Sequence, residues 1–197
     1  LLAHLGMTGY FYFKKNNFFQ KTSFYISFKK NNNKHDHIIF VMQNNIQLVY
    51  NDIRRFGFLI VKKTTDLYKM DCLKKLGPEP LSKNFRTKLF EKNCKKEINI
   101  KNLLMNQAFV SGLGNIYVNE ILFRSKIYPE KKVNKLIFSE YTKIIRSTKY
   151  LLKRAIHLGG SSIKNFKNTK GDSGTFQENF KVYGREGMLC KTYNCNY

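Results

Sequence analysis

The stretch "SGLGNIYVNE", residues 111–120, is the most informative part of the sequence. Gly112 and Gly114 allow the backbone to come close to a ligand, and Asn115 then begins a helix that we expect to end near residue 126. The first N–H groups of a helix lack intrahelical partners and lie at the positive end of its dipole, so they favour a phosphate. Such glycine-containing turns also serve as plain connections, and the residues alone leave both interpretations open.

Basic residues dominate the sequence around this turn and along the whole chain. Lys95, Lys96 and Lys101 precede the turn, near a helix predicted over about 98–110, so that a cationic wall could face the same phosphate. The chain carries 36 Lys and Arg against 13 Asp and Glu, a formal net charge of +23. An AT-rich genome explains many lysines but not the scarcity of acids, so the charge favours a polyanionic partner, with nucleic acid first.

A longer amphipathic helix is predicted over 137–156, where apolar residues recur three and four positions apart. Ser139 is expected to cap its start, and Gly159 and Gly160 are expected to end it. Together with the two shorter helices, this pattern predicts a helical region over residues 84–158.

Residues 10–60 have a β pattern of short aromatic or β-branched segments separated by Lys- and Asn-rich turns. Asn44 and Asn45 tolerate positive φ and are expected at the turn of a hairpin. The stretch "LGPEPLS", residues 76–82, holds two prolines that no helix or central strand accommodates, and we place the domain boundary in the connector 61–83. The sequence therefore predicts an α+β protein.

Two further stretches carry candidate binding residues. In "NDIRRFGF", residues 51–58, Arg54 offers a planar fork of donors and Phe56 could stack or wedge between bases, although a buried Phe56 is equally compatible with the pattern. In "HLGMTG", residues 4–9, Met7 is either a core residue or an exposed apolar wedge. No Ser/His/Asp set and no H-E-x-x-H motif occurs.

The cysteines are too few for a secreted disulfide framework, which indicates a reducing compartment. Cys72 and Cys94 have no close partner in sequence and are expected to be buried or inert thiols. Cys190 and Cys195 have the C-x₄-C spacing of a metal knuckle, but two thiolates do not complete a tetrahedral site. Taken alone, this pair is compatible with a metal site, a disulfide or incidental thiols.

Taken together and in order, these motifs resemble the bacterial formamidopyrimidine-DNA glycosylase family. The resemblance runs from Leu1 to Cys195 and rests on the collinear stretches "HLGMTG", "KHDHIIFVM", "YNDIRRFG", "LGPEPLS", "GLGNIYVNEILFRSKIYP", "GGSSIKNF" and "FKVYGREG", the last followed by the cysteine pair. It implies a partial N-terminal β-sandwich, a helix–two-turn–helix domain and a truncated β-hairpin zinc finger. The implied parts are the catalytic β-sandwich at 1–66, a linker at 67–83, the DNA-binding domain at 84–160, a lesion-capping loop at 161–180 and the start of the finger at 181–197.

The resemblance also implies a function. Members of this family are DNA glycosylases and AP lyases that excise oxidised purines such as 8-oxoguanine and formamidopyrimidines from duplex DNA in base excision repair. Their nucleophile is an N-terminal proline that forms a Schiff base, and the resemblance places it ahead of Leu1, so we expect no catalytic residue here and an inactive fragment. The alternative is a non-catalytic module that binds damaged DNA.

The resemblance assigns roles to particular residues. It implies that Met7, Arg54 and Phe56 fill the space left by the flipped base, so that the wedge interpretation replaces the core interpretation. Cys190 and Cys195 are implied to be half of a four-cysteine site for one structural Zn²⁺, with no stable zinc in this chain. We expect damaged double-stranded DNA as partner, no membrane, no small-molecule cofactor, a monomer and a bacterial cytoplasmic location. The implied DNA contacts are His35, Arg54, Lys96, Lys101, Asn115 and Tyr183.

Overall fold

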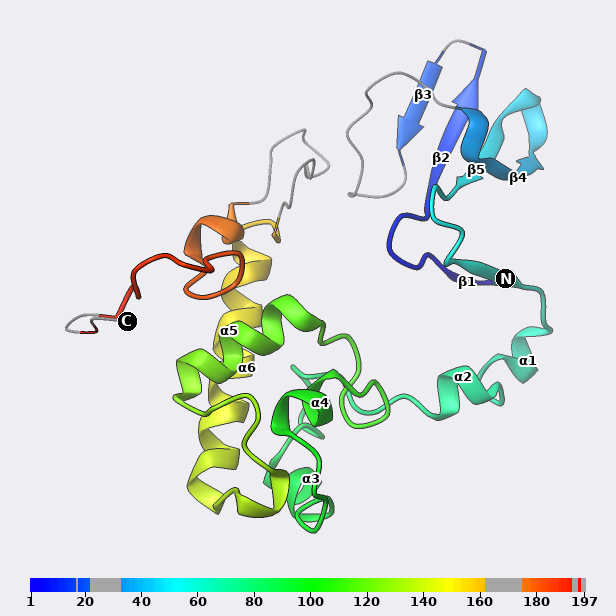
Figure 1. Ribbon diagram of the computed structural model, residues 1–197. Coiled ribbons are helices and arrows are strands. Elements are labelled where there is room, and N and C mark those ends of the chain that lie inside the picture. The colour runs from blue at the N-terminus through cyan, green and yellow to red at the C-terminus, as the bar shows by residue number, and fades with distance from the viewer. Residues whose placement is uncertain (17, 22–32, 162–174, 193–194, 196–197) are drawn as a thin grey trace. The chain divides into compact units, whose positions relative to one another are not determined.

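The computed structural model describes residues 1–197 except 17, 22–32, 162–174, 193–194 and 196–197. The chain divides into two compact units. The first comprises Leu1–Lys69 with Ser161–Thr175, and the second comprises Met70–Gly160 with Phe176–Tyr197. Strands gather in the first unit and most helices in the second, which confirms the expected α+β class (Figure 1).

Two antiparallel sheets form the first unit. Their strands are β1 (Leu2–His4), β2 (Tyr10–Lys15), β3 (Phe18–Lys21), β4 (Asp36–Val41), β5 (Gln47–Asn51) and β6 (Phe58–Ile60). The larger has the order β3-β2-β5-β4, and the smaller pairs β1 with β6. The buried apolar side chains of the larger sheet lie on its central strands, β2 and β5. Tyr12 of β2 lies opposite Val49 of β5 in the register, and both are almost fully buried, as is Tyr50. The predicted strand at 23–28 lies outside the described residues.

The turn between β4 and β5 confirms the hairpin expected there. Asn44 and Asn45 have φ values of 58° and 56°, in the left-handed region that asparagine tolerates. The N–H of Met42 donates to the carbonyl of Ile46 at 2.8 Å and closes the turn. The two asparagines therefore fix the register of the two strands that follow and precede them.

Most of the helices belong to the second unit, and a short one lies in the first. They are α1 (Thr64–Leu67), α2 (Asp71–Lys74), α3 (Thr87–Glu91), α4 (Ile100–Met105), α5 (Asn115–Ser125) and α6 (Phe138–His157), with 3-10 turns η1 (Asn33–His35), η2 (Gln43–Asn45), η3 (Val133–Lys135) and η4 (Phe176–Asn179). None of the helices in the described part of the chain is both long and apolar enough to cross a bilayer.

The two cysteines that were expected to be buried or inert thiols differ in burial. Cys72 is exposed rather than buried, and Cys94 is half-buried.

The helix predicted over 98–110 is wrong in its bounds, because α4 ends at Met105. Gln107 explains the early end. Its side-chain amide donates to the carbonyl of Leu113 at 2.9 Å, and its amide oxygen accepts the N–H of Gly112 at 2.7 Å. These bonds fold the chain back into the turn that leads to α5, and periodicity alone does not reveal such a side-chain-to-backbone clamp.

The long helix α6 lies within one residue of its predicted bounds, but its start differs in chemistry. Ile137, not Ser139, is the N-cap, and the Glu140 carboxylate accepts the Ile137 N–H at 3.0 Å. Lys131 holds that carboxylate at 2.7 Å, so Glu140 fills the capping role expected of the serine. Gly159 and Gly160 end the helix with positive φ, as expected.

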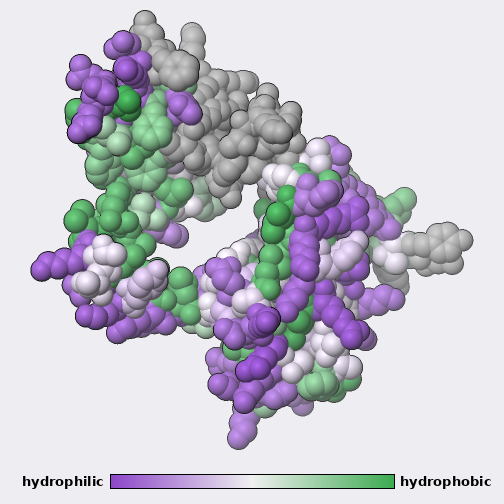
Figure 2. Space-filling view, turned by 180° about the vertical axis from the view of Figure 1, so that it is seen from behind, coloured by the Kyte–Doolittle hydropathy of each residue, from purple (hydrophilic) through white to green (hydrophobic). Residues whose placement is uncertain are grey.

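The larger of two hydrophobic clusters in the described part of the helical unit is rich in phenylalanine, and the smaller one consists of Ala155, Phe176 and Phe180. Phe90 lies at the centre of the larger cluster, with ring centroids 5.9, 5.1 and 5.2 Å from those of Phe85, Phe109 and Tyr141. Seen from behind, hydrophilic side chains cover most of this unit around a narrow hydrophobic band (Figure 2). The remaining buried members of the core are Ile100, Leu103, Leu104, Val110, Leu113, Val118, Ile121, Leu122, Ile127, Val133, Leu136 and Ile144.

The central position of Phe90 leads to a stability prediction. Replacing Phe90 by alanine should lower the free energy of unfolding by about 3–5 kcal/mol, because a fully buried ring is lost and a cavity remains. Phe138→Ala is the matched control, since Phe138 is 62% exposed and its loss should change stability by no more than about 0.5 kcal/mol. Urea unfolding followed by circular dichroism measures both, and equal effects would contradict the assignment of Phe90 to the core.

Candidate nucleic-acid interface

The three predicted wedge residues form a cluster in the first unit. Met7 lies on the turn between β1 and β2, while Arg54 and Phe56 lie on the turn between β5 and β6. The Arg54 guanidinium contacts the Met7 sulfur at 3.0 Å and lies 4.5 Å from the centre of the Phe56 ring. Met7 is 72% exposed and Phe56 is 55% exposed, so the interpretation of these two side chains as core residues is wrong.

Asp52 holds the two turns together. Its carboxylate is almost completely buried and accepts hydrogen bonds from the hydroxyl groups of Thr8 at 2.5 Å and Tyr50 at 3.1 Å. It also accepts the backbone N–H groups of Arg54 at 3.3 Å and Gly57 at 2.9 Å. Thr8 follows Met7, and Gly57 follows Phe56, so one carboxylate fixes the backbone beside every wedge residue.

The close approach of the two turns depends on a glycine. Gly6 has a φ of +61°, and a Cβ atom there would lie 2.8 Å from the carbonyl carbon of Phe56. A side chain at this position would therefore force the two turns apart. This close contact explains why a glycine occupies the first glycine position of "HLGMTG".

His35 contacts the backbone of Asp52. Its carbonyl accepts the Asp52 N–H at 3.0 Å, and the Nε2 atom of His37 lies 2.8 Å from the Asp52 carbonyl oxygen. His35 itself is half-buried at the end of η1. The structure thus brings the predicted phosphate contact His35 to the base of the wedge cluster, although its contact with phosphate stays a prediction.

The environment of Asp52 also fixes its protonation. Burial alone would raise its pKa, but the hydrogen bonds from Thr8, Gly57, Tyr50 and Arg54 outweigh burial and hold the pKa below its ordinary value. Asp52 is therefore ionised at neutral pH and attracts the four donors as a full negative charge. Tyr50, whose hydroxyl is buried and bonded to this anion, has its pKa raised to about 12.

In the second unit, Asn115 is the first residue of α5 and is exposed. A Cβ atom added to Gly112 or Gly114 would meet no described atom within 4 Å, so the space over the preceding turn is open. Lys101 lies in the first turn of α4, which packs against α5, and Lys96 lies ahead of α4 and is exposed. That these residues contact the same phosphate stays a prediction.

Glu120 connects α5 to the segment that carries Tyr183. Its buried carboxylate accepts the backbone N–H groups of Lys181, Val182 and Tyr183 at 2.9–3.1 Å. The Tyr183 ring packs edge-on against Phe180 at a centroid distance of 5.8 Å. Glu120 therefore fixes where the predicted phosphate contact Tyr183 lies relative to α5.

Sequence reasoning did not single out Asp52 or Glu120, although both belong to the quoted motifs. One signal was available, since the chain has only 13 acids and these two stand inside motifs that otherwise point to an anion. A carboxylate next to a proposed anion site is unfavourable unless it faces inward. The structure shows that both do.

The two C-terminal cysteines form a close pair. Hydrogen bonds from Thr192 and then from Cys195 lower the pKa of the Cys190 thiol, and the Thr192 N–H lies 3.4 Å from its sulfur. A thiol that ionises readily suits a zinc ligand. Among the described residues, no group of three or more His, Cys, Asp or Glu side chains is placed to hold a metal, so the pair fits two ligand positions of a four-ligand site.

The role of Asp52 predicts a pH-dependent effect on stability. Asp52→Asn should lower the free energy of unfolding of the first unit by about 2 kcal/mol at pH 7, because an amide cannot accept all four hydrogen bonds. Because the folded-state pKa is lowered, the wild-type contribution is present above the unfolded pKa and is lost as pH falls below about 4. The difference between the two proteins should therefore shrink in acid.

Urea unfolding at several pH values measures this difference. Asp66→Asn is the control in the same unit, since Asp66 forms only an exposed ion pair with Lys69 and its loss should cost less than about 1 kcal/mol. A difference between Asp52→Asn and wild type that stays constant down to acid pH would show that the Asp52 charge does not stabilise the turns.

Comparison with known protein families gives two matches. Residues 1–59 match the model of the formamidopyrimidine-DNA glycosylase N-terminal domain, and residues 76–167 match the model of the formamidopyrimidine-DNA glycosylase H2TH domain. The two matches cover the wedge cluster and the turn at Asn115, respectively.

Curated relatives and solved structures agree with these matches. A formamidopyrimidine-DNA glycosylase of Roseobacter denitrificans is 39% identical over 196 residues, which are 99% of this chain and 68% of that protein. One from Rickettsia bellii is 39% identical over 191 residues, which are 96% of this chain and 65% of that protein.

Among solved structures, a Lactococcus lactis FPG mutant in complex with a Fapy-dG containing DNA has a TM-score of 0.78 at 35% identity. The complex between the Lactococcus lactis Fpg and an abasic site containing DNA has a TM-score of 0.77 at 37% identity. In both cases 96% of this chain and 65% of that chain are covered, so the chain spans just under two thirds of their length. The chain belongs to the formamidopyrimidine-DNA glycosylase family.

Proposed function

We propose that the protein containing this chain is a DNA glycosylase and AP lyase that excises oxidised purines, such as 8-oxoguanine and formamidopyrimidines, from duplex DNA. The observation that carries the proposal is the exposed cluster of Met7, Arg54 and Phe56, fixed on its backbone by Asp52, in a chain of this family. Its partner is damaged double-stranded DNA, and in a bacterium that places the protein in the cytoplasm with the chromosome.

The cluster suits the work of holding DNA from which a base has been flipped out. Extruding a nucleotide costs a few kcal/mol of stacking and pairing, and less for a damaged base. Met7 and Phe56 are exposed apolar side chains that can occupy the vacated space. Arg54 carries donors that can pair with the acceptors of the orphaned opposite base.

The remaining predicted contacts supply attraction to the phosphate backbone. Lys96 and Lys101 are cations, Asn115 stands at a helix N-terminus, and His35 and Tyr183 lie on segments that Asp52 and Glu120 hold in place. Such contacts position DNA without reading its sequence and weaken as salt rises. This fits a protein that must inspect every sequence for a damaged base.

The bond-breaking step is assigned to no residue of this chain. In the family it belongs to an N-terminal secondary amine, so residues 1–197 supply recognition and DNA distortion. A borohydride-trapping experiment separates the enzyme from a non-catalytic damaged-DNA-binding module. The complete protein incubated with an 8-oxoguanine duplex and borohydride should give a covalent protein–DNA adduct, and a protein that binds this duplex without any adduct is the non-catalytic module.

The wedge assignment predicts a loss of lesion binding when Phe56 is replaced. Phe56→Ala should weaken binding to a duplex with an abasic-site analogue by about 1–3 kcal/mol, the range found for a base stacked on an aromatic ring. Fluorescence anisotropy measures the affinity, and Phe138→Ala is the control, because that phenylalanine is also exposed but lies at the start of α6. If Phe56→Ala and wild type bind the abasic-site duplex equally, the wedge assignment fails.

We infer that Cys190 and Cys195 bind one structural Zn²⁺ together with two further ligands in the complete protein. Support comes from the closeness of the two sulfur atoms and the lowered pKa of the Cys190 thiol. The zinc would stabilise the segment after Tyr183. Metal analysis of the purified complete protein should give one Zn²⁺ per chain, and Cys190→Ser should release it, whereas Cys72→Ser, at an exposed cysteine distant in sequence, should not. Full zinc content in Cys190→Ser would contradict the assignment.

A further inference from the structure

A second group of cations lies at the far end of α5, away from the turn that carries Asn115. Asn115 and Arg124 are nine residues apart on this helix, which places them about 14 Å apart along its axis. Here the end of α5 runs beside α6. We call this surface the α5–α6 basic face and define it by Arg124, Lys126, Lys143, Arg146 and Arg154.

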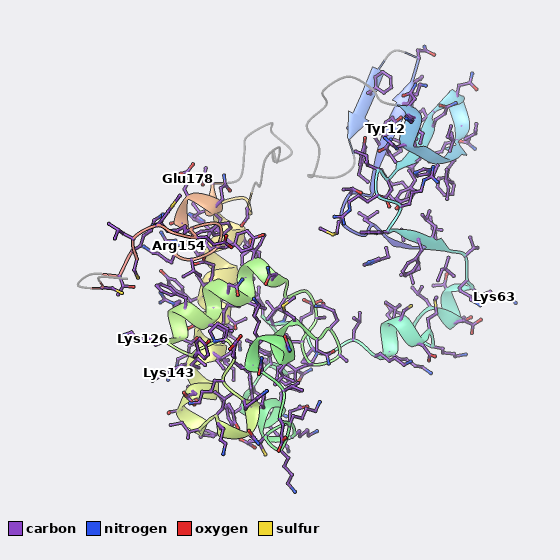
Figure 3. The ribbon with its side chains drawn as sticks, viewed as in Figure 1. Tyr12, Lys63, Lys126, Lys143, Arg154 and Glu178 are labelled. Carbon is purple, nitrogen blue, oxygen red and sulfur yellow. The ribbon has the colours of Figure 1, made fainter. Side chains whose placement is uncertain are left out.

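The sequence of α6 places its share of these cations in one row. Lys143, Arg146, Tyr150 and Arg154 are spaced by three or four residues and so follow one side of the helix, over about 16 Å of its length. Figure 3 shows Lys126 and Lys143 on the left side of the helical unit and Arg154 higher up, beside the upper part of α6. The row is therefore long enough to follow several phosphates of one DNA strand.

Two of the arginines are held in position by Tyr150. The Arg124 guanidinium lies 3.7 Å from the centre of the Tyr150 ring, and Arg154 donates from Nη1 to the Tyr150 hydroxyl at 3.1 Å. A second nitrogen of Arg154 donates to Asn179 at 2.9 Å. The hydrogen bond from Arg154 lowers the pKa of Tyr150, and the positive charges of Arg154 and Arg124 lower it further. Preorganised arginines lose less conformational entropy on binding an anion.

In the part of the chain that the structure describes, no ion pair includes these cations, although the Glu140 carboxylate, which is paired with Lys131, also feels the charge of Lys143. The ion pairs found there join Lys69 to Asp66, Lys75 to Asp71 and Lys131 to Glu140, and none includes the basic face. The C-terminal end of α5 contributes only about half a negative charge. The basic face therefore keeps most of its positive charge.

The chemistry of one hollow in the basic face suits a sugar–phosphate backbone. Arg124, Lys126, Lys143, Arg146 and Tyr150 surround a hollow of about 620 Å³. Its floor is formed by Ser125 and Ser147, which are small and buried. Besides the Tyr150 ring, every side chain around this hollow carries a positive charge or a hydroxyl group, which suits the oxygens of phosphate.

We propose that the α5–α6 basic face binds the phosphate backbone of duplex DNA as a second contact surface, separate from the turn that carries Asn115. The contact requires no damaged base, because lysine and arginine contacts to phosphate position DNA without reading its bases. Its purpose is to retain the protein on undamaged DNA between lesions. It does not depend on the proposed excision of oxidised purines.

A charge-reversal experiment tests the affinity that this face supplies. Binding of the chain to a lesion-free duplex is followed by fluorescence anisotropy over a range of salt. Lys143→Glu with Arg146→Glu should weaken binding and reduce the slope of log affinity against log salt by about two, since each phosphate contact contributes about 0.9. The matched control is Lys88→Glu with Lys92→Glu, an equal charge change at two exposed lysines, one within α3 and the other at its C-cap.

The control should retain the wild-type slope. Equal losses in the two double variants would overturn the proposal, because the effect would then be one of net charge alone. If the glutamate pair does not fold, Lys143→Gln with Arg146→Gln removes the same cations without reversing them, and its slope should also fall.

A footprint locates the contact directly. Lys126 and Lys143 should react more slowly with a lysine-methylating reagent when the lesion-free duplex is bound, as read by mass spectrometry, while Lys88 should react at the same rate. The protection should persist in Asn115→Asp, which weakens the other predicted phosphate site. Unchanged reactivity of Lys126 and Lys143 at saturating DNA would overturn the proposal, and so would protection that disappears with Asn115→Asp.

Discussion

A buried carboxylate that accepts the N–H groups of a neighbouring loop is the interaction on which both candidate contact regions depend. Asp52 does this for the wedge turns, and Glu120 does it for the segment around Tyr183. Burying an isolated carboxylate is unfavourable by many kcal/mol, but several donors around it offset that cost. Removal of either carboxylate would leave several loop N–H groups without their acceptor at once, so each acid fixes a whole loop.

This use of acids also explains the surface charge. The chain has 13 acids for 36 basic residues, and two of those acids point inward to hold loops. The anion that organises each region therefore lies beneath it, while the cations remain outside. A phosphate meets lysine and arginine first, and the buried carboxylate is screened from it by the groups that it holds. The same protein can in this way combine an ordered loop with a positive surface.

Local patterns predicted the parts of the fold that depend on local physics. The starts and ends of α5 and α6 and the positive φ of Asn44 and Asn45 follow from periodicity and from residue conformational preference. The fold of α4 did not, because Gln107 ends that helix through contacts beyond its own turn.

Local sequence patterns predicted even less of the contacts that hold the candidate site together. Thr8 and Asp52 are 44 residues apart, and Glu120 is 61–63 residues from its three partners. No spacing rule within a window of the sequence relates such positions. The motifs predicted which side chains contact DNA, but the residues that hold those side chains in place were identified only from the folded structure.

The wedge cluster illustrates why a fixed backbone with exchangeable side chains suits a protein that probes DNA. In the free chain, Arg54 lies over Phe56 and touches Met7, a contact worth about 0.5–1 kcal/mol at an exposed site. Stacking on a base is worth about 1–3 kcal/mol, so the side chains gain by exchanging their mutual contacts for contacts with DNA. The hydrogen bonds to Asp52 do not involve those side chains and can persist through the exchange. The loop therefore needs no refolding when it meets DNA, and the free energy of ordering its backbone is spent during folding rather than at each inspected base pair.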